Sequence, residues 1–122
     1  MTHTVVHFEI PADDVNRLKG FYAGLFDWDV EETPGMPDYL MIHTAPEGQG
    51  VNGGLMKKQL PQQKPVNYIN VESITDYVAK VTDLGGQVVM PKTAIPKMGY
   101  FAICLDPEAN PFGLWETDAK AA

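Results

Sequence analysis

The stretch "GYFAICLDPEANPFGLWE", Gly99 to Glu116, decides the fold of this 122-residue chain. Its two ends are rich in aromatic and apolar residues, while "DPEANP" between them is rich in turn formers, so the stretch predicts two strands joined by a tight turn. An earlier stretch, "YLMIHT", begins at Tyr39 in the way that "YFAICL" begins at Tyr100. A Gly-Leu pair follows each of them, at Gly54 and at Gly113. The same structural unit is therefore expected twice in the chain.

The order of elements supports this repeat, because each half is expected to run strand, helix, strand, strand, strand. In the first half we expect strands at 4–10, 28–32, 38–44 and 51–58 around a helix at 12–28, with a stop at Gly24. In the second half we expect strands at 66–71, 87–90, 99–106 and 112–117 around a helix at 72–86, and a loop at 91–98. The polar, proline-rich stretch 59–64 is expected to be a linker.

The two halves align at a spacing of 61 residues, which places His7 opposite Tyr68 and Tyr39 opposite Tyr100. A shift of two residues then places Lys57 opposite Glu116. Four short strands and one helix bury little by themselves, so the halves are expected to form one domain of two fused units.

The composition restricts the possible partners. A formal charge of -7 and a pI near 4.7 disfavour nucleic acid and anionic membranes, whose phosphates need clustered Lys and Arg. The single cysteine, Cys104, leaves no internal disulfide and suits a reducing compartment. The start of the chain does not have the pattern of a signal peptide, and no apolar run is long enough for a membrane helix. A soluble cytoplasmic protein is expected.

The stretches "FYAGLFDW" and "DPEANPFGLWE" within this repeat resemble the vicinal oxygen chelate superfamily, which contains glyoxalase I, bleomycin-resistance proteins and extradiol dioxygenases. The resemblance covers nearly the whole chain and is strongest to short bacterial glyoxalase-like proteins. It implies an α+β domain of two tandem β-α-β-β-β modules, at 3–58 and 65–118, that form an incomplete barrel with a central cleft. It also implies a small-molecule ligand and a homodimer.

Enzymes of this superfamily hold a divalent metal with residues from the first and last strands of each module. Carried over to this chain, those positions are His7, Lys57, Tyr68 and Glu116. His7 and Glu116 match the family, and the resemblance makes them candidate ligands for Zn, Ni, Mn or Fe. Tyr68 stands where many members have His, and Lys57 where glyoxalases have Glu. A protonated lysine has no lone pair for a metal, so the expected metal site is incomplete.

Two other arrangements use the same four residues. In the first, Lys57 and Glu116 form an ion pair at the cleft, and His7 and Tyr68 hydrogen-bond across it. In the second, Lys57 binds an anionic group of a small ligand, Glu116 accepts a hydroxyl or amine, and His7 transfers a proton.

Further side chains are candidates for the wall of the cleft. By strand alternation His43 shares a face with Tyr39, so it is either a ligand-binding residue or an ordinary strand-end histidine. Trp115 and Phe101 are candidate ligand contacts or core residues.

Three functions follow as alternatives. The first is a glyoxalase-like lyase, isomerase or dioxygenase in which Glu116, His7 and Tyr68 are catalytic. The second is a non-catalytic protein that sequesters its ligand, as the drug-resistance members do. The third is a scaffold without a ligand, because a fold alone does not determine a function.

Overall fold

A computed structural model describes residues 2–122 and divides the chain into two compact units. The N-terminal unit is His7–Pro65, and the C-terminal unit is Val66–Ala122 together with the residues up to Val6. Each unit holds one helix and a four-stranded mixed sheet among the described residues. None of the helices in this part of the chain is long and apolar enough to cross a membrane.

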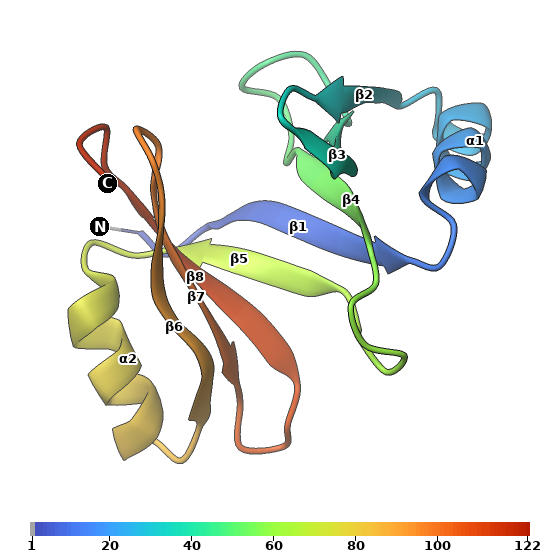
Figure 1. The fold of residues 1–122 in the computed structure, drawn as a ribbon. Coiled ribbons are helices and arrows are strands. Elements are labelled where there is room, and N and C mark those ends of the chain that lie inside the picture. The colour runs from blue at the N-terminus through green and yellow to red at the C-terminus, as the bar shows by residue number, and fades with distance from the viewer. Residues whose placement is uncertain (1) are drawn as a thin grey trace. The chain divides into compact units, whose positions relative to one another are not determined.

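The N-terminal unit contains β1 (Val5–Ala12), α1 (Val15–Phe26), β2 (Asp29–Thr33), β3 (Met36–His43) and β4 (Gly53–Lys57). Its strands lie in the order β2-β3-β4-β1, with β1 parallel to β4 and the other pairs antiparallel (Figure 1). The helix begins after Asp14, whose carboxylate accepts a hydrogen bond from the amide of Arg17 as an N-cap does.

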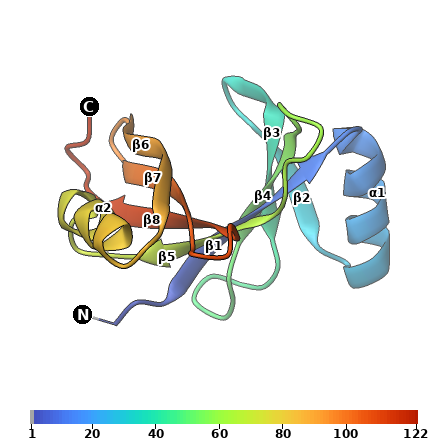
Figure 2. The same ribbon diagram turned by 90° about the horizontal axis from the view of Figure 1, so that it is seen from below.

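The C-terminal unit contains β5 (Val66–Asn70), α2 (Ile74–Asp83), β6 (Gln87–Ile95), β7 (Gly99–Leu105) and β8 (Pro111–Thr117). Its strand order is β6-β7-β8-β5, with β5 parallel to β8, so it repeats the arrangement of the N-terminal unit. Figure 2 shows each helix beside the strands of its own unit. The predicted α+β fold of two β-α-β-β-β modules is confirmed; the cleft and the exact module bounds stay predictions.

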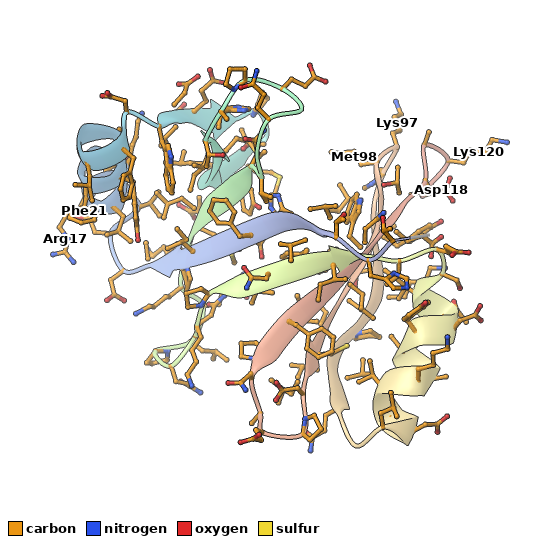
Figure 3. The ribbon with its side chains drawn as sticks, turned by 180° about the vertical axis from the view of Figure 1, so that it is seen from behind. Arg17, Phe21, Lys97, Met98, Asp118 and Lys120 are labelled. Atoms are coloured by element: carbon orange, nitrogen blue, oxygen red, sulfur yellow. The ribbon has the colours of Figure 1, made fainter. Side chains whose placement is uncertain are left out.

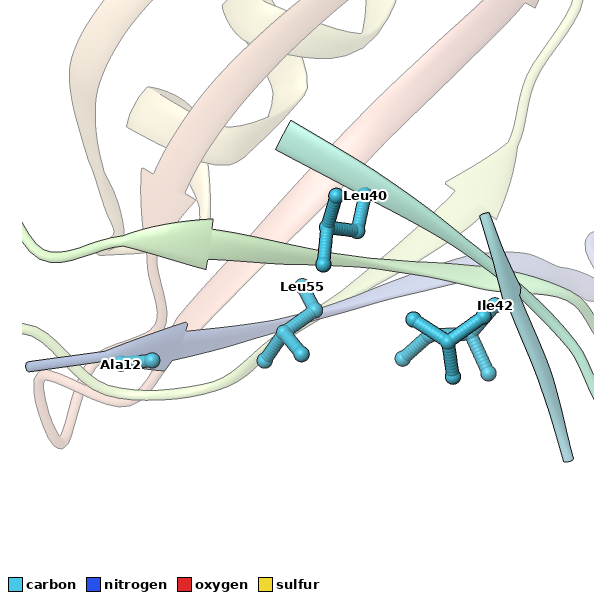
Figure 4. Close-up of a cluster of buried hydrophobic side chains, with 5 residues drawn as sticks. Ala12, Leu40, Ile42 and Leu55 are labelled. Carbon is cyan, nitrogen blue, oxygen red and sulfur yellow. The ribbon is translucent and has the colours of Figure 1, made fainter. Parts of the chain in front are cut away.

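Each sheet buries the face that its helix covers. In the N-terminal unit the core consists of Ala12, Val30, Leu40, Ile42 and Leu55, four of which are labelled in Figure 4. From α1, Val15 and Leu18 pack against this cluster, whereas Phe21 is exposed (Figure 3). In the C-terminal unit the core consists of Val71, Ile74, Ala102, Cys104 and Leu114. Alternation along the strands sends the intervening side chains to the opposite, helix-free face of each sheet.

Two predicted element ends are wrong. The first helix does not stop at Gly24 but continues to Phe26, and Asp27 ends it in the left-handed conformation with φ of 57°. The strand predicted at 87–90 continues to Ile95 through the region expected to be a loop. Two register shifts against β7 and a position at the edge of the sheet let this strand include Pro91.

The register also corrects the alignment of the two modules. Glu9 pairs with Gly54, and Tyr68 pairs with Gly113, so Tyr68 is the counterpart of Glu9 and not of His7. Glu9 and Tyr68 are 59 residues apart, and the N-cap residues of the two helices, Asp14 and Ser73, have the same spacing. Tyr39 pairs with Met56 as Phe101 pairs with Trp115, so Phe101 and not Tyr100 is the counterpart of Tyr39.

Candidate functional site

Three polar side chains meet on the helix-free face of the N-terminal unit. His7 and Glu9 come from β1, two residues apart and therefore on one face, and Tyr39 reaches them from β3. The Tyr39 hydroxyl lies 2.7 Å from His7 Nε2 and donates a hydrogen bond of 2.8 Å to Glu9 Oε2. The side chains of His7 and Glu9 are 28% and 17% exposed, so this His7–Tyr39–Glu9 group lies partly out of water.

The hydrogen bonds fix the protonation of this group. Tyr39 has one hydroxyl hydrogen, and it goes to Glu9, so the Tyr39 oxygen accepts the hydrogen on His7 Nε2. Burial lowers the pKa of His7 from its usual 6.5, and the nearby Glu9 carboxylate opposes this shift. At neutral pH the His7 imidazole of this group is therefore neutral.

Glycine beneath the tyrosine makes this arrangement possible. Gly54 of β4 pairs with Glu9 on one side and with Met41 on the other, and a Cβ atom at position 54 would collide with the Tyr39 hydroxyl and ring. Any side chain at this position would displace Tyr39 from His7 and Glu9. The glycine thus leaves the space that the tyrosine hydroxyl occupies.

In the C-terminal unit, aromatic side chains lie at two of the positions that correspond to the His7–Tyr39–Glu9 group. Tyr68 lies over Gly113, where a Cβ atom would collide with the Tyr68 ring, and Tyr68 is 6% exposed. Its ring makes an edge contact with Phe101 at a centroid distance of 6.4 Å. The next residue on this face of β8 by alternation, Trp115, is half-buried and donates a hydrogen bond to Thr117. Aromatic rings thus stand where the N-terminal unit has its polar group.

Glu116 points to the other face of its sheet. It is half-buried, and its carboxylate accepts a 2.9 Å hydrogen bond from the amide of Ile74, the first residue of α2. The positive end of a helix favours a carboxylate at this position. Glu116 therefore has a structural partner within its own unit.

Lys57 and His43 lie at strand ends. Lys57 is exposed at the end of β4, and by alternation it points to the side of the sheet where Leu55 is buried. His43 ends β3 and lies 3.7 Å from the exposed carboxylate of Glu31. The roles predicted for Lys57, His43, Tyr68 and Glu116 stay predictions.

Sequence reasoning selected His7 but missed Glu9 and Tyr39 as its partners. One signal was available, since Glu9 follows His7 at the spacing that puts both on one face of a strand. The contact with Tyr39 needed the register of β3 against β4, which sequence spacing does not determine.

The donor set does not fit a divalent metal. Across residues 2–122, no three His, Cys, Asp or Glu side chains gather into a group that could hold an ion. His7 Nε2 and Glu9 already bond to Tyr39, and they supply two donors where a metal needs at least three from the protein. The structure therefore gives no step that depends on a metal.

Comparison with known proteins identifies the family. Residues 4–114 match the model of the Glyoxalase/Bleomycin resistance protein/Dioxygenase superfamily. The chain belongs to this superfamily. It is 28% identical over 125 residues to the proposed glyoxylase CFP32 of Mycobacterium bovis and of Mycobacterium tuberculosis. The match covers 90% of this chain but 44% of CFP32, so the chain spans less than half the length of these relatives.

Solved structures support the fold. A hypothetical protein of Bacillus halodurans has a TM-score of 0.70 at 15% identity, covering 100% of this chain and 99% of its own. A superfamily member from Vibrio splendidus has a TM-score of 0.67 at 16% identity, covering 96% of this chain and 100% of its own. At these identities the likeness shows the shared fold and not a shared activity.

Proposed function

We propose that the chain is a small-molecule-binding protein of this superfamily, in which the His7–Tyr39–Glu9 group binds a polar group of an organic ligand. The observation that carries the proposal is the hydrogen-bonded meeting of these side chains on a helix-free sheet face above Gly54. Partly buried polar side chains that converge on one point in this way are typical of a ligand site.

The charge of the group indicates the chemical class of ligand. Glu9 contributes a carboxylate, while the His7 imidazole is neutral, so the group favours a neutral or cationic ligand with a hydroxyl or amine. A ligand carboxylate about 4 Å from Glu9 would be repelled by about 4 kcal/mol at an effective dielectric of about 20. The acidic charge of the whole chain acts in the same direction.

Thermal unfolding of the chelator-treated protein with a panel of matched compounds tests this proposal. Small hydroxyl compounds and amines are expected to raise the melting temperature with concentration, and the matching carboxylates are not. Glu9→Gln and Tyr39→Phe should weaken binding of the best compound by roughly tenfold, the loss of about one charged hydrogen bond. Glu32→Gln removes an exposed carboxylate from the same unit and is the control. A panel without a binder, or binding that both variants retain, would refute the proposal.

A second candidate is acid–base catalysis, such as an isomerase or lyase reaction. It is favoured by the chain of hydrogen bonds that joins His7 to Tyr39 and Glu9, because such a chain can move a proton on and off a bound ligand. Exchange of a bound ketone's α-hydrogen with solvent deuterium tests it. If exchange occurs and His7→Gln abolishes it, catalysis is supported. If no bound ketone exchanges its α-hydrogen, the catalytic candidate is wrong and only ligand binding remains.

We infer, in addition, that the protein is a cytoplasmic homodimer. The support for pairing is the length of CFP32, which is more than twice that of the matching chain and so has room for a second domain of this size. The buried, unpaired Cys104 suits a reducing compartment.

A further inference from the structure

The disagreement between the donor set and a metal has a local cause in the N-terminal unit. His7 and Glu9 are both metal-ligating residue types, and their nearest nitrogen and oxygen lie 3.9 Å apart on one sheet face. One more donor beside them would complete the minimum set for a divalent ion. The question is which position could supply it.

The register indicates position 54. Gly54 is the direct partner of Glu9 on the neighbouring strand, and a Cβ atom there points at the Tyr39 hydroxyl, the atom that already bonds to both His7 and Glu9. A carboxylate side chain at this position would project into the place that the hydroxyl now holds. A third donor at position 54 and the Tyr39 hydroxyl therefore cannot occupy this place together, and the chain has the glycine with the tyrosine.

We propose that the Tyr39 hydroxyl, seated over Gly54, occupies the place of a missing third metal ligand and keeps His7 and Glu9 as a metal-free, hydrogen-bonded group. Tyr39 is thus a specificity-determining residue, which directs this sheet face to organic ligands and away from divalent ions. The C-terminal unit also has a glycine at the corresponding position, Gly113, but the ring that covers it is Tyr68, the counterpart of Glu9.

The proposal is tested by restoring the donor. In Gly54→Glu/Tyr39→Ala the ring is removed, and a second carboxylate faces His7 and Glu9 as the third donor. This variant is expected to bind one Zn²⁺ or Co²⁺ per chain with micromolar or tighter affinity, with a rise in melting temperature and a visible Co²⁺ absorption band. The wild-type protein is expected to show neither change under the same conditions.

Two further variants keep the test specific. Gly54→Gln/Tyr39→Ala has the same bulk without the charge, and adding His7→Ala to the restored variant removes one donor; both should lose the Co²⁺ band. If the glutamate variant does not fold, Gly54→Asp/Tyr39→Ala places a shorter carboxylate at the same position. The proposal is wrong if wild-type protein binds one metal ion per chain through His7, or if the folded carboxylate variants bind none.

Discussion

Glu9 and Tyr68 stand at the same place in the two modules, yet they give the two helix-free faces different chemistry. Glu9 accepts a hydrogen bond from Tyr39 and keeps a charge on the face of the N-terminal unit. Tyr68 instead packs over Gly113 and against Phe101, which makes the face of the C-terminal unit aromatic. The repeat of the backbone therefore does not carry a repeat of the chemistry.

The lowered pKa of His7 predicts a pH dependence of stability. Above pH 6.5 the imidazole is neutral in the folded and unfolded chains, so it does not change the free energy of unfolding with pH. Below pH 6.5 the unfolded chain binds the proton more readily, so the free energy of unfolding falls as the pH decreases towards the folded pKa. Each unit of pKa difference is worth about 1.4 kcal/mol.

Urea unfolding at a series of pH values measures this effect. His7→Gln should have a flatter profile than wild type just below pH 6.5, whatever its stability at neutral pH. Hydrogen bonds from Asn110 lower the pKa of the Asp106 carboxyl, so Asp106 makes the free energy of unfolding depend on pH only below pH 3.8. The effects of His7 and Asp106 therefore fall in separate pH ranges. Parallel profiles between pH 6.5 and 5 would contradict the prediction.

The role of a strand residue could be predicted only where the sequence indicated which face of the sheet its side chain points to. His7 was chosen because it stands at a metal-ligand position of the superfamily that the chain resembles. The role of Glu116 at a metal or ligand site stays a prediction; alternation places its side chain on the helix-covered face, where it accepts a hydrogen bond from the Ile74 amide. The face to which Glu116 points is set by which of its neighbours, Leu114 or Trp115, enters the core, and both are apolar.

Helix α2 shows how the chain fixes an element from two directions. Ser73 caps it locally by accepting a hydrogen bond from the Asp76 amide, while Glu116 reaches the Ile74 amide from β8. The second contact ties the start of the helix to the last strand of the same unit.

Removing either cap should destabilise the protein. Ser73→Ala is expected to cost about 1 kcal/mol, and Glu116→Ala about 1–2 kcal/mol because it leaves a partly buried amide without its acceptor. Thermal unfolding followed by circular dichroism measures both changes. Glu47→Ala removes an exposed loop carboxylate and should leave the melting temperature unchanged. A Glu116→Ala protein as stable as wild type would show that this cap contributes nothing.

The elements themselves were mostly predictable, because apolar residues recur at strand or helix spacing in both halves. The failures have physical reasons. Gly24 lies inside α1, where its lack of a side chain is tolerated, and Asp27 adopts the conformation expected of glycine. Pro91 was interpreted as a strand end, but an edge strand accepts proline where no amide is needed.

At the scale of the whole molecule, the fold was predictable because it depends on the order of elements and not on any single residue. The strand orders of the two units are the same, as the repeat requires. The repeat did not determine which residues of the two modules correspond. A spacing of 61 residues assigned the wrong counterparts to His7 and Tyr39.

The assembly state is a prediction at this scale. Light scattering coupled to size-exclusion chromatography is expected to give twice the chain mass of 13.5 kDa at micromolar concentration. The same chromatogram for CFP32 is the informative comparison, because that chain is long enough to contain two such domains. A mass of one chain at every concentration would contradict the homodimer.

The first residues of the chain belong to the unit that the last residues form. His3 bonds to the Asn70 carbonyl and to the Tyr77 hydroxyl, each at 3.0 Å, and Thr4 accepts from the Asn70 amide. A protease cut in the linker at 59–64 would therefore leave an N-terminal fragment that still carries a piece of the other half. The two pieces should remain together after the cut and should reassemble when they are expressed separately, which makes the chain suitable as a split reporter.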